Sequence, residues 1–344
     1  TASVPALLMI FGIAAAEGRD VASCDIAGAY LHAFMDKDKE PVHMRIFRDV
    51  VHWLLQLRPD MESYVQPDGS MVVEVVKSMY GTVEAGRQWY EHLSGTLLAD
   101  GFVMNEYESC VFNKDCGGVQ ITVLVYVDDL VITSVNPDLV TATLNMLEKR
   151  YGDLSITRGN VHEYLGMIFE VRTAEKEVRV SMAKYLEDVL SEFEVSRAVT
   201  SPATHGLFEA KKSDELEADR KKKFHTVVAQ LLYLCKRVRI DIMTAVSYLC
   251  TRVQCPTEQD WDKLMRVINY LHGTRQHAIM IRLKVPYEVH AWVDASFAEH
   301  DDGKGHTGVF ATMGQGPIFC KSSKQRCVAS STTESELVAL TDGL

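Results

Sequence analysis

Two adjacent aspartates lie in the middle of a stretch that otherwise has the composition of a buried β-hairpin. Residues 121–127 and 130–134 are rich in Val, Ile, Thr and Tyr, which suit the pleated surface of a sheet, and Asp128 and Asp129 stand between them. A two-residue hairpin turn usually contains glycine, because its residues need a positive φ angle. Neighbouring carboxylates also repel each other, which raises one pKa. A divalent metal ion bound to the pair would explain both features, and a turn that merely faces water is the alternative.

The bulk composition predicts a folded chain of two or three domains. The chain has 344 residues, of which 47% are hydrophobic, so it exceeds one ordinary domain and is not a disordered protein. Its net charge of −11 argues against a broad basic face. Any contact with nucleic acid must therefore depend on local basic patches and on metal ions.

The eight cysteines form no pattern typical of a zinc site or a disulfide framework, since none belongs to a C-x-x-C pair. Scattered cysteines of this kind predict buried thiols in a reducing, intracellular compartment. The apolar run at 6–16 is too short to cross a bilayer and predicts a buried helix, so no membrane partner is expected. The chain begins with Thr1 and ends at Leu344 within a helical pattern, which indicates a piece of a longer polyprotein.

The pattern of apolar residues predicts an α+β fold. Strands are expected at 21–24, 42–47, 71–77, 121–127, 130–134, 163–171, 177–182, 288–293, 308–313, 317–321 and 326–329. Helices are expected at 1–18, 81–98, 139–151, 183–193, 224–238, 241–252, 257–272 and 331–340. Residues 200–223 contain Pro202, Gly206 and a dense mixed-charge stretch, which indicates an internal linker.

A third carboxylate, Asp25, closes the early predicted strand. If that strand neighbours the hairpin in one sheet, Asp25, Asp128 and Asp129 meet at one edge. Converging carboxylates suit two divalent ions about 3.5–4 Å apart, as in metal-dependent phosphoryl transfer. Hard oxygen ligands favour Mg²⁺ or Mn²⁺.

Short motifs recur in a fixed order along nearly the whole chain. They are DIAGAYLH at 25–32, SMYGTVEAGRQWY at 78–90, YVDDL at 126–130, YLGM at 164–167, QLLYL at 230–234, Trp261, YLHGT at 270–274, AWVDAS at 291–296 and SSTTESEL at 330–337. In this order they resemble the reverse-transcriptase motifs of copia-type LTR retrotransposons, followed by a ribonuclease-H-like segment.

The resemblance implies a right-hand polymerase followed by a partial ribonuclease-H-like βββα segment. Its fingers and palm would occupy 1–155, its thumb and connection 156–285, and the incomplete ribonuclease-H-like part 286–344. The implied activity is that of an RNA-directed DNA polymerase that uses two Mg²⁺ or Mn²⁺ ions. The implied partners are an RNA or DNA template with its primer, deoxynucleoside triphosphates and other parts of a retroelement polyprotein. The implied location is a cytoplasmic particle of the element, or the nucleus.

The resemblance also implies roles for individual residues. Asp25 and Asp128 would hold the two catalytic metal ions, and Asp129 would complete the acidic cluster. The other implied roles are contacts with the incoming nucleotide, and they fall on Ile26, Ala27, Tyr30, Tyr80, Gly81 and Arg87. The backbone amides of Ile26 and Ala27 would approach the triphosphate.

Three of these contacts have a specific form. Tyr30 would lie under the sugar and reject a ribose 2′-hydroxyl, and a core aromatic is the alternative. Tyr80 and Gly81 would lie where the fingers meet the nucleotide and the template. Arg87 would be the basic contact, and a solvated helix arginine is the alternative.

The chain departs from the family at three positions. Glu84 and Gly86 stand near the places where the family carries a lysine and a proline, which removes a positive charge near the nucleic acid. Ile240 replaces the proline that the family carries between Arg239 and Asp241. These changes leave the three aspartates untouched.

The ribonuclease-H-like segment carries two of the four acids that such a site needs. Asp294 falls on its first strand and Glu336 on its first helix, as the family's first two metal ligands do. The later two acids lie beyond this segment, and Asp342 is too close to Glu336 to replace one. We therefore expect no competent RNA-cleaving site in this chain.

Three basic tracts are candidates for contact with a phosphate backbone. Residues 220–223 are flanked by acids and indicate a solvated linker, 236–239 predict a duplex contact, and 321–326 could lie beside a hybrid. Two rival functions remain open at this point. One is a decayed or repurposed element that binds nucleic acid without polymerising, and the other is a nuclease that acts through the C-terminal part.

Overall fold

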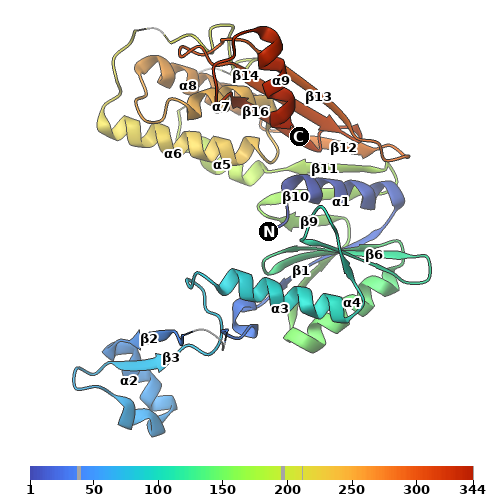
Figure 1. Cartoon of the computed structure of the whole chain (residues 1–344), viewed down its shortest axis with the longest axis vertical. Coiled ribbons are helices and arrows are strands. Elements are labelled where there is room, and N and C mark those ends of the chain that lie inside the picture. The colour runs from blue at the N-terminus through green and yellow to red at the C-terminus, as the bar shows by residue number, and fades with distance from the viewer. Residues whose placement is uncertain (37–39, 195–197, 211, 344) are drawn as a thin grey trace. The chain divides into compact units, whose positions relative to one another are not determined.

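The computed structural model describes residues 1–36, 40–194, 198–210 and 212–343, and it divides into two compact units (Figure 1). The first unit comprises Thr1–Ala2 and Ala22–Thr157, and the second comprises Ser3–Val21 and Arg158–Leu344. Helices and sheets occur in both, which confirms the α+β class. The sequence analysis placed the first helix with the fingers and palm, but that helix belongs to the second unit.

A six-stranded sheet forms the centre of the first unit. Its strands follow the order β4 (Val103–Met104), β5 (Val111–Asp115), β6 (Gln120–Tyr126), β7 (Asp129–Ser134), β1 (Asp20–Ile26) and β8 (Leu154–Arg158). The strand that carries Asp25 is therefore the direct neighbour of the hairpin strand β7, although more than a hundred residues of chain separate them.

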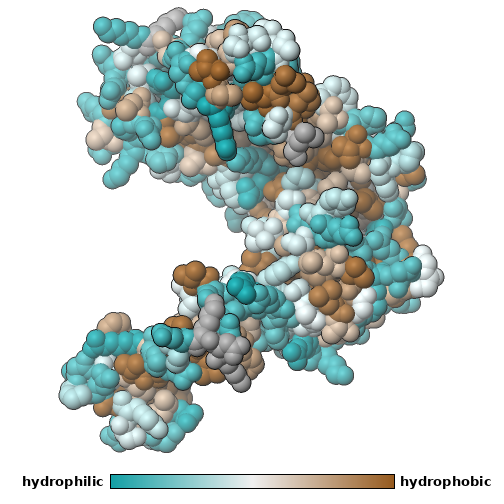
Figure 2. Space-filling view, viewed as in Figure 1, coloured by the Kyte–Doolittle hydropathy of each residue, from teal (hydrophilic) through white to brown (hydrophobic). Residues whose placement is uncertain are grey.

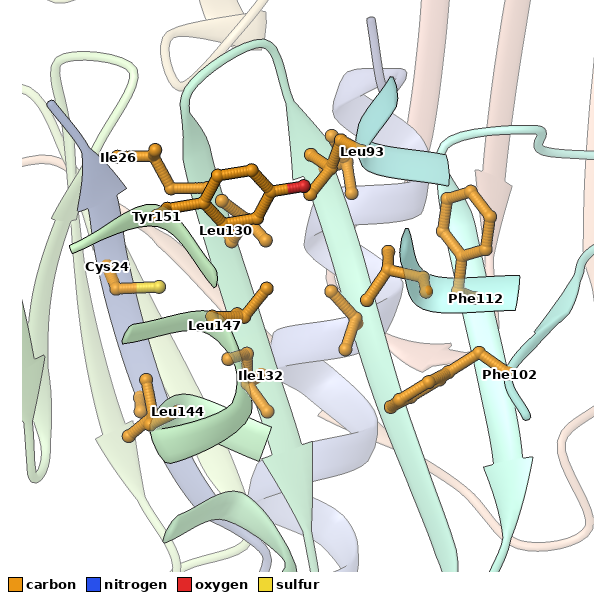
Figure 3. Packing of buried hydrophobic residues seen from close by; sticks show 14 of the residues in the cluster. Cys24, Ile26, Leu93, Phe102, Phe112, Leu130, Ile132, Leu144, Leu147 and Tyr151 are labelled. Carbon is orange, nitrogen blue, oxygen red and sulfur yellow. The ribbon is translucent and has the colours of Figure 1, made fainter. Parts of the chain in front are cut away.

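Two helices cover one face of this sheet, namely α3 (Ala85–Ala99) and α4 (Pro137–Tyr151) (Figure 3). Helix α3 buries a stripe of residues four apart, Ala85, Trp89, Leu93 and Leu97, as an amphipathic helix should. Asn136 caps the start of helix α4, because its side chain accepts a hydrogen bond from the Asp138 amide. Buried residues of both helices pack on alternate residues of β1, β6 and β7.

A small module within the first unit was only partly predicted. It contains β2 (His43–Ile46), α2 (Arg48–Leu57), the 3₁₀ helix η2 (Pro59–Tyr64) and β3 (Met71–Glu74), and its two strands pair antiparallel. Helix α2 was missed, and Val51 is its one buried residue. Phe47, Trp53 and Leu57 are 69%, 65% and 81% exposed, so this module carries apolar side chains on its surface (Figure 2).

Helix α1 (Val4–Glu17) packs against the first sheet of the second unit. That sheet has the order β15 (Gly314–Gln315), β12 (Ile279–Leu283), β11 (Glu177–Ser181), β10 (Met167–Arg172) and β9 (Val161–Tyr164). Phe11 of α1 stacks on Phe169 of β10 with ring centroids 4.1 Å apart. Gly12 permits close approach, because a Cβ there would lie 2.9 Å from the Leu283 side chain. The predicted buried helix is confirmed, and its burial explains why α1 belongs to this unit.

One predicted strand of the second unit is in fact a hairpin. The sequence analysis expected a single strand at 163–171, but β9 and β10 pair antiparallel with Tyr164 opposite Met167. Leu165 and Gly166 form the turn, and both have a positive φ angle (53° and 74°), as a type I′ turn requires. The Leu-Gly pair is the turn signal that the prediction overlooked.

Helices and a second sheet complete this unit. The helices are α5 (Ala183–Leu190), α6 (Ala218–Cys235), α7 (Met243–Cys250), α8 (Glu258–Gly273) and α9 (Thr332–Gly343), with the 3₁₀ helix η3 (Ile240–Ile242) between α6 and α7. The sheet has the order β13 (His290–Ser296), β14 (His306–Thr312) and β16 (Phe319–Lys324). The strand predicted at 326–329 is wrong: β16 ends at Lys324, the buried Gln325 side chain then bonds to Ser335 of α9, and residues 326–329 form a loop.

Four further expectations can be compared with the structure. All eight cysteines are free thiols. Among the described helices, none combines the length and the apolar character needed to cross a bilayer. The linker predicted at 200–223 ends earlier than expected, because α6 already begins at Ala218. The basic tract at 220–223 is therefore helical, and Arg220 forms an ion pair with Glu258 of α8.

Candidate active site

The turn of the acidic hairpin consists of Val127 and Asp128, one residue earlier than predicted. Tyr126 pairs with Asp129 across the hairpin, so Asp129 is the first residue of β7 rather than a turn residue. Val127 has a φ angle of 61°, a conformation that is strained for a β-branched side chain. Strain of this kind persists only where the surroundings enforce it, and it clusters at functional sites.

Two hydrogen bonds hold this strained turn in place. The indole Nε1 of the buried Trp89 donates to the Val127 carbonyl at 2.6 Å. The Ile26 amide donates to the Asp128 carbonyl at 3.1 Å. The turn is thus tied to α3 through Trp89 and to β1 through Ile26. Trp89 belongs to the motif at 78–90, but no local pattern in the sequence indicates its partner Val127.

Alternation along the strands places Asp25 and Asp129 on the same face of the sheet. Cys24 and Ile26 of β1, together with Leu130 and Ile132 of β7, point into the core under α3 and α4 (Figure 3). Successive side chains of a strand point to opposite faces. The side chains that alternate with this set, including those of Asp25 and Asp129, therefore lie on the face away from the helices. Asp128 lies in the turn that joins β6 to β7, directly before Asp129.

The carboxylates perturb one another. Burial raises the pKa of Asp25, and the charge of Asp128 raises it further. Burial also raises the pKa of Asp129, with added contributions from Asp128 and then Asp25. Burial raises the pKa of the neighbouring Cys24 thiol to about 12, and Asp25 and Asp129 add to this effect. The end of the sheet is thus a region of negative potential, which attracts cations.

The donor set fits a hard divalent cation, because carboxylate oxygens are the ligands that Mg²⁺ and Mn²⁺ prefer. The geometry is more open than a finished coordination sphere. Within the described ranges, no three His, Cys, Asp or Glu side chains are grouped as metal ligands. The three aspartates therefore have the chemistry of a metal site, and metal binding belongs to the proposal below.

The structure brings two of the implied nucleotide contacts to the acidic cluster. The rings of Tyr30 and Tyr80 lie 4.5 Å apart between centroids, at an angle of 59°. Burial raises the pKa of Tyr80, and the charges of Asp128, Tyr30 and Asp25 contribute in that order. Tyr80 is nevertheless 54% exposed. Tyr30 packs at the edge of the core rather than within it, so the pair forms an aromatic wall beside the carboxylates.

The implied backbone contacts are only partly supported. Ile26 is buried and its amide already donates to Asp128, so we correct the expectation that this amide approaches a triphosphate. Ala27 follows it and is exposed. Gly81 is also exposed, and its φ angle of 94° is one that glycine adopts without strain.

Arg87 fits its alternative interpretation. The side chain is exposed on α3, and its Nε donates to Glu91 at 2.7 Å, one turn further along the helix. This bond raises the pKa of Arg87. Arg87 lines a polar cavity of about 420 Å³ together with Asp36 and Glu84. It is a solvated helix arginine in this structure and does not reach the acidic cluster.

The two ribonuclease-H-like acids are not brought together. A Cβ at Gly343 of α9 would lie 3.2 Å from the Val293 side chain, so Val293 faces α9. Alternation then directs the exposed Asp294 to the opposite face of β13, whereas Glu336 lies on α9 itself. Asp342 accepts a hydrogen bond from Thr307 and lies 3.7 Å from the Lys321 ammonium.

The basic tract at 236–239 also needs a correction. Arg239 is 2% exposed, and its guanidinium bonds to Asp241 and to Thr274. A buried and paired arginine cannot contact a duplex, so the expectation that this tract contacts nucleic acid is wrong for Arg239. Lys236 is exposed, and the Arg237 guanidinium lies over the Tyr233 ring at 3.5 Å.

Comparison with known proteins gives consistent matches. Residues 2–204 match the family model described as reverse transcriptase (RNA-dependent DNA polymerase). The Retrovirus-related Pol polyprotein from transposon RE1 of Arabidopsis thaliana is 31% identical over 273 residues, which cover 77% of this chain and 18% of that polyprotein. The corresponding polyprotein from transposon TNT 1-94 of Nicotiana tabacum is 27% identical over 350 residues, which cover 97% of this chain and 24% of that polyprotein. The chain thus spans about a quarter or less of either relative.

Proposed function

We propose that this chain, which belongs to the reverse transcriptase (RNA-dependent DNA polymerase) family and corresponds to the reverse transcriptase region of a copia-type retrotransposon, synthesises DNA on an RNA or DNA template. Its substrates would be deoxynucleoside triphosphates and the 3′ end of a primer. The observation that carries the proposal is the placement of Asp25 on the strand beside the Asp128–Asp129 hairpin, with Asp25 and Asp129 on one face. Other parts of a polyprotein would accompany the chain in its element.

The three carboxylates would hold two Mg²⁺ or Mn²⁺ ions. Asp25 and Asp128 would be the principal ligands, and Asp129 would complete the cluster. When bound, such ions activate the primer 3′-hydroxyl as a nucleophile and neutralise the leaving pyrophosphate. Burial and the charge of Asp128 raise the pKa of both Asp25 and Asp129, so a dication would stabilise these carboxylates more than it would stabilise isolated surface carboxylates.

The protein would hold this cluster in position before the substrates bind. Trp89 fixes the Val127 carbonyl and Ile26 fixes the Asp128 carbonyl, so the backbone under the carboxylates has little freedom. Catalytic groups that are already in position need less reorganisation during the reaction.

The aromatic wall would select the sugar. Tyr30 and Tyr80 lie together beside Asp25 and Asp128, and Tyr80 is more than half exposed. A flat, rigid ring under the sugar would collide with a ribose 2′-hydroxyl and leave deoxyribose undisturbed. The exposed backbone at Ala27 is the remaining candidate for a contact with the triphosphate.

Primer extension tests the proposal. The purified chain is mixed with an RNA template, a DNA primer, deoxynucleoside triphosphates and Mg²⁺, and the extended primer is measured. Asp128→Asn should abolish extension. Asp115→Asn is a matched control, because Asp115 is the exposed last residue of β5 and the asparagine Oδ1 can still accept the hydrogen bond of the Gly118 amide. Equal extension by the wild type and Asp128→Asn would contradict the proposal.

A second candidate function is binding of nucleic acid without polymerisation. Two observations favour it, namely the open arrangement of the acids in the described residues and the absence of the family's lysine and proline near Glu84 and Gly86. Salt-dependent binding of an RNA–DNA hybrid without Mg²⁺-dependent extension would support this candidate over the first.

A further inference from the structure

A cavity of about 660 Å³ lies within the second unit, and none of its lining residues belongs to the acidic hairpin. The residues that line it come from the start of α1, the end of α6, the segment through η3 and α7, β12 and β16. They are Val4, Pro5, Leu8, Leu232, Lys236, Arg237, Ile240, Met243, Ser247, Cys250, Ile279 and residues 317–323. The volume falls within the range of pockets that bind small molecules.

The walls of the cavity are mainly apolar. Leu8, Leu232, Met243 and Ile318 contribute aliphatic or thioether surface from four different elements or segments. Two cysteines, Cys250 and Cys320, also line it. Burial raises the pKa of the Cys250 thiol, and it raises that of Cys320 to about 11. Both thiols therefore stay protonated at neutral pH, so the walls suit an apolar body that is not attached covalently.

The charge around the cavity is of one sign. Lys236, Arg237 and Lys321 line it, and none of its lining residues is acidic. This contrasts with the whole chain, in which 47 acidic residues outnumber 36 basic ones. Apolar walls with low polarisability also strengthen the field of a nearby cation.

Two of these cations have no carboxylate partner. Within the described part of the chain, the Lys236 ammonium makes no ion pair or hydrogen bond. The Arg237 Nη1 donates to the Tyr233 carbonyl at 3.2 Å, but its buried Nε has no partner. Lys321 differs, because it donates to the Asp342 carbonyl at 2.6 Å and lies near the Asp342 carboxylate. Lys236 and Arg237 thus leave positive charge available at the cavity.

We propose that this cavity binds a small amphiphilic anion, with an apolar body against the walls and a carboxylate or sulfonate group beside Lys236 and Arg237. The charge complementarity selects an acid over a neutral or cationic molecule, and the volume limits the ligand to drug-like size.

Fluorescence titration with anilinonaphthalene sulfonate tests the proposal, because this dye joins an aromatic body to one sulfonate. We expect saturable binding of one dye per chain, weakened by added salt. Lys236→Gln should weaken it by about fivefold to tenfold, as expected for the loss of a charge-assisted contact. N-phenylnaphthylamine has the same body without the sulfonate, and its binding should stay unchanged in this variant.

Matched variants locate the dye. Lys222→Gln removes an exposed lysine of α6, the helix that ends directly before Lys236; Lys222 does not line the cavity, so this change should leave binding unchanged. Ser247→Trp and Val4→Trp each fill the cavity from a different element and should abolish binding of both dyes. Far-UV circular dichroism and the unfolding temperature show which filling variants remain folded.

Three results would overturn the proposal. The first is equal sulfonate binding by the wild type and Lys236→Gln. The second is unchanged binding by a folded filling variant, which would place the dye elsewhere. The third is stoichiometric displacement of the dye by a short DNA duplex, which would assign the two cations to nucleic acid. Primer extension does not enter these measurements, so a failure here is distinct from a failure of the proposed polymerase activity.

Discussion

The backbone amide of Ile26 donates a hydrogen bond to the carbonyl of Asp128 at 3.1 Å. This bond joins the strand that carries Asp25 to the turn that carries Asp128. Because the bond is made by backbone atoms, it fixes the position of β1 relative to the β6–β7 turn independently of the side chains. The distance between the carboxylates is therefore set by the sheet rather than by flexible loops.

Trp89→Phe should loosen the acidic turn. The change keeps an aromatic ring in the core but leaves the Val127 carbonyl without its donor, which should cost about 1–3 kcal/mol of unfolding free energy. Extension should fall together with stability, because Val127 would relax from its strained φ angle. Urea unfolding and primer extension measure the two effects. Trp53→Phe is the control, since Trp53 is 65% exposed; a similar loss in that variant would remove the special role of Trp89.

Asp25→Asn should stabilise the protein while abolishing extension. The folded protein raises the pKa of Asp25, so the ionised carboxylate destabilises the fold at pH values above that pKa. The gain in unfolding temperature should therefore be present at pH 7 and vanish as the pH falls to where Asp25 is protonated in both states. Extension should fall by at least ~10²-fold. Scanning calorimetry against pH measures the first effect, and a destabilised variant at pH 7 would contradict it.

Tyr30→Ala should relax the choice of sugar. Without the ring under the nucleotide, incorporation of ribonucleotides should rise by about tenfold or more relative to deoxyribonucleotides, because the steric barrier is removed. Single-nucleotide extension with each type of triphosphate gives the ratio. Tyr64→Ala provides a matched control on η2, where Tyr64 is 67% exposed. An unchanged ratio in Tyr30→Ala would remove this residue from the nucleotide site.

The His300–His306 pair should make the second unit sensitive to acid. The two buried rings share a hydrogen bond of 3.0 Å, and burial followed by the charge of His300 lowers the pKa of His306 to about 4. Burial also lowers the pKa of His300, with a further contribution from Lys324, although Asp301 and Asp302 oppose it. The unfolded chain binds protons first, so stability is full above pH 6.5 and is lost as the pH falls toward 4.

The size of this effect is about 2–3 kcal/mol at pH 4, from the lowered pKa of His306 alone. Urea unfolding at several pH values measures it, and His306→Gln should show a flatter profile between pH 6.5 and 4. Carboxylates titrate in the same range in both proteins, so the difference between the two profiles isolates the histidine. Parallel profiles would disprove the assignment.

Arg239→Ala should destabilise the fold rather than act on nucleic-acid binding alone. The change removes the partner of Asp241 from a buried pair, which should cost about 3 kcal/mol. Lys236→Ala, on the exposed neighbour, should leave the unfolding free energy almost unchanged. Chemical unfolding separates the two variants, and equal stability of Arg239→Ala and the wild type would contradict the observed burial.

Elements with a strong local pattern were predictable. The apolar run that became α1, the paired strands β6 and β7, and the body of α4 each have a period within a few residues, although the helix expected from residue 139 begins at Pro137, directly after its cap Asn136. The motif order likewise identified the family without any structure. Helix α2 was missed because its apolar residues face solvent, whereas Val51 is its one buried residue.

Features that depend on distant pairing were not predictable. The turn register differs by one residue, because it is set by the cross-strand pairing of Tyr126 with Asp129 and by the donors Trp89 and Ile26. The burial of Arg239 depends on Asp241 and Thr274, and the position of Thr274 is set by a different helix. A basic tract looks the same in sequence whether its arginine is buried or exposed.

The sequence by itself determined the fold class, the identities of the three aspartates and the family, because composition, period and motif order are properties of the chain alone. Only the tertiary structure decided that β1 lies beside β7, that Asp25 and Asp129 share a face, and that α1 packs in the second unit. The physical reason is that strand adjacency and helix docking are set by the summed burial of residues far apart in sequence, and no local pattern encodes that sum.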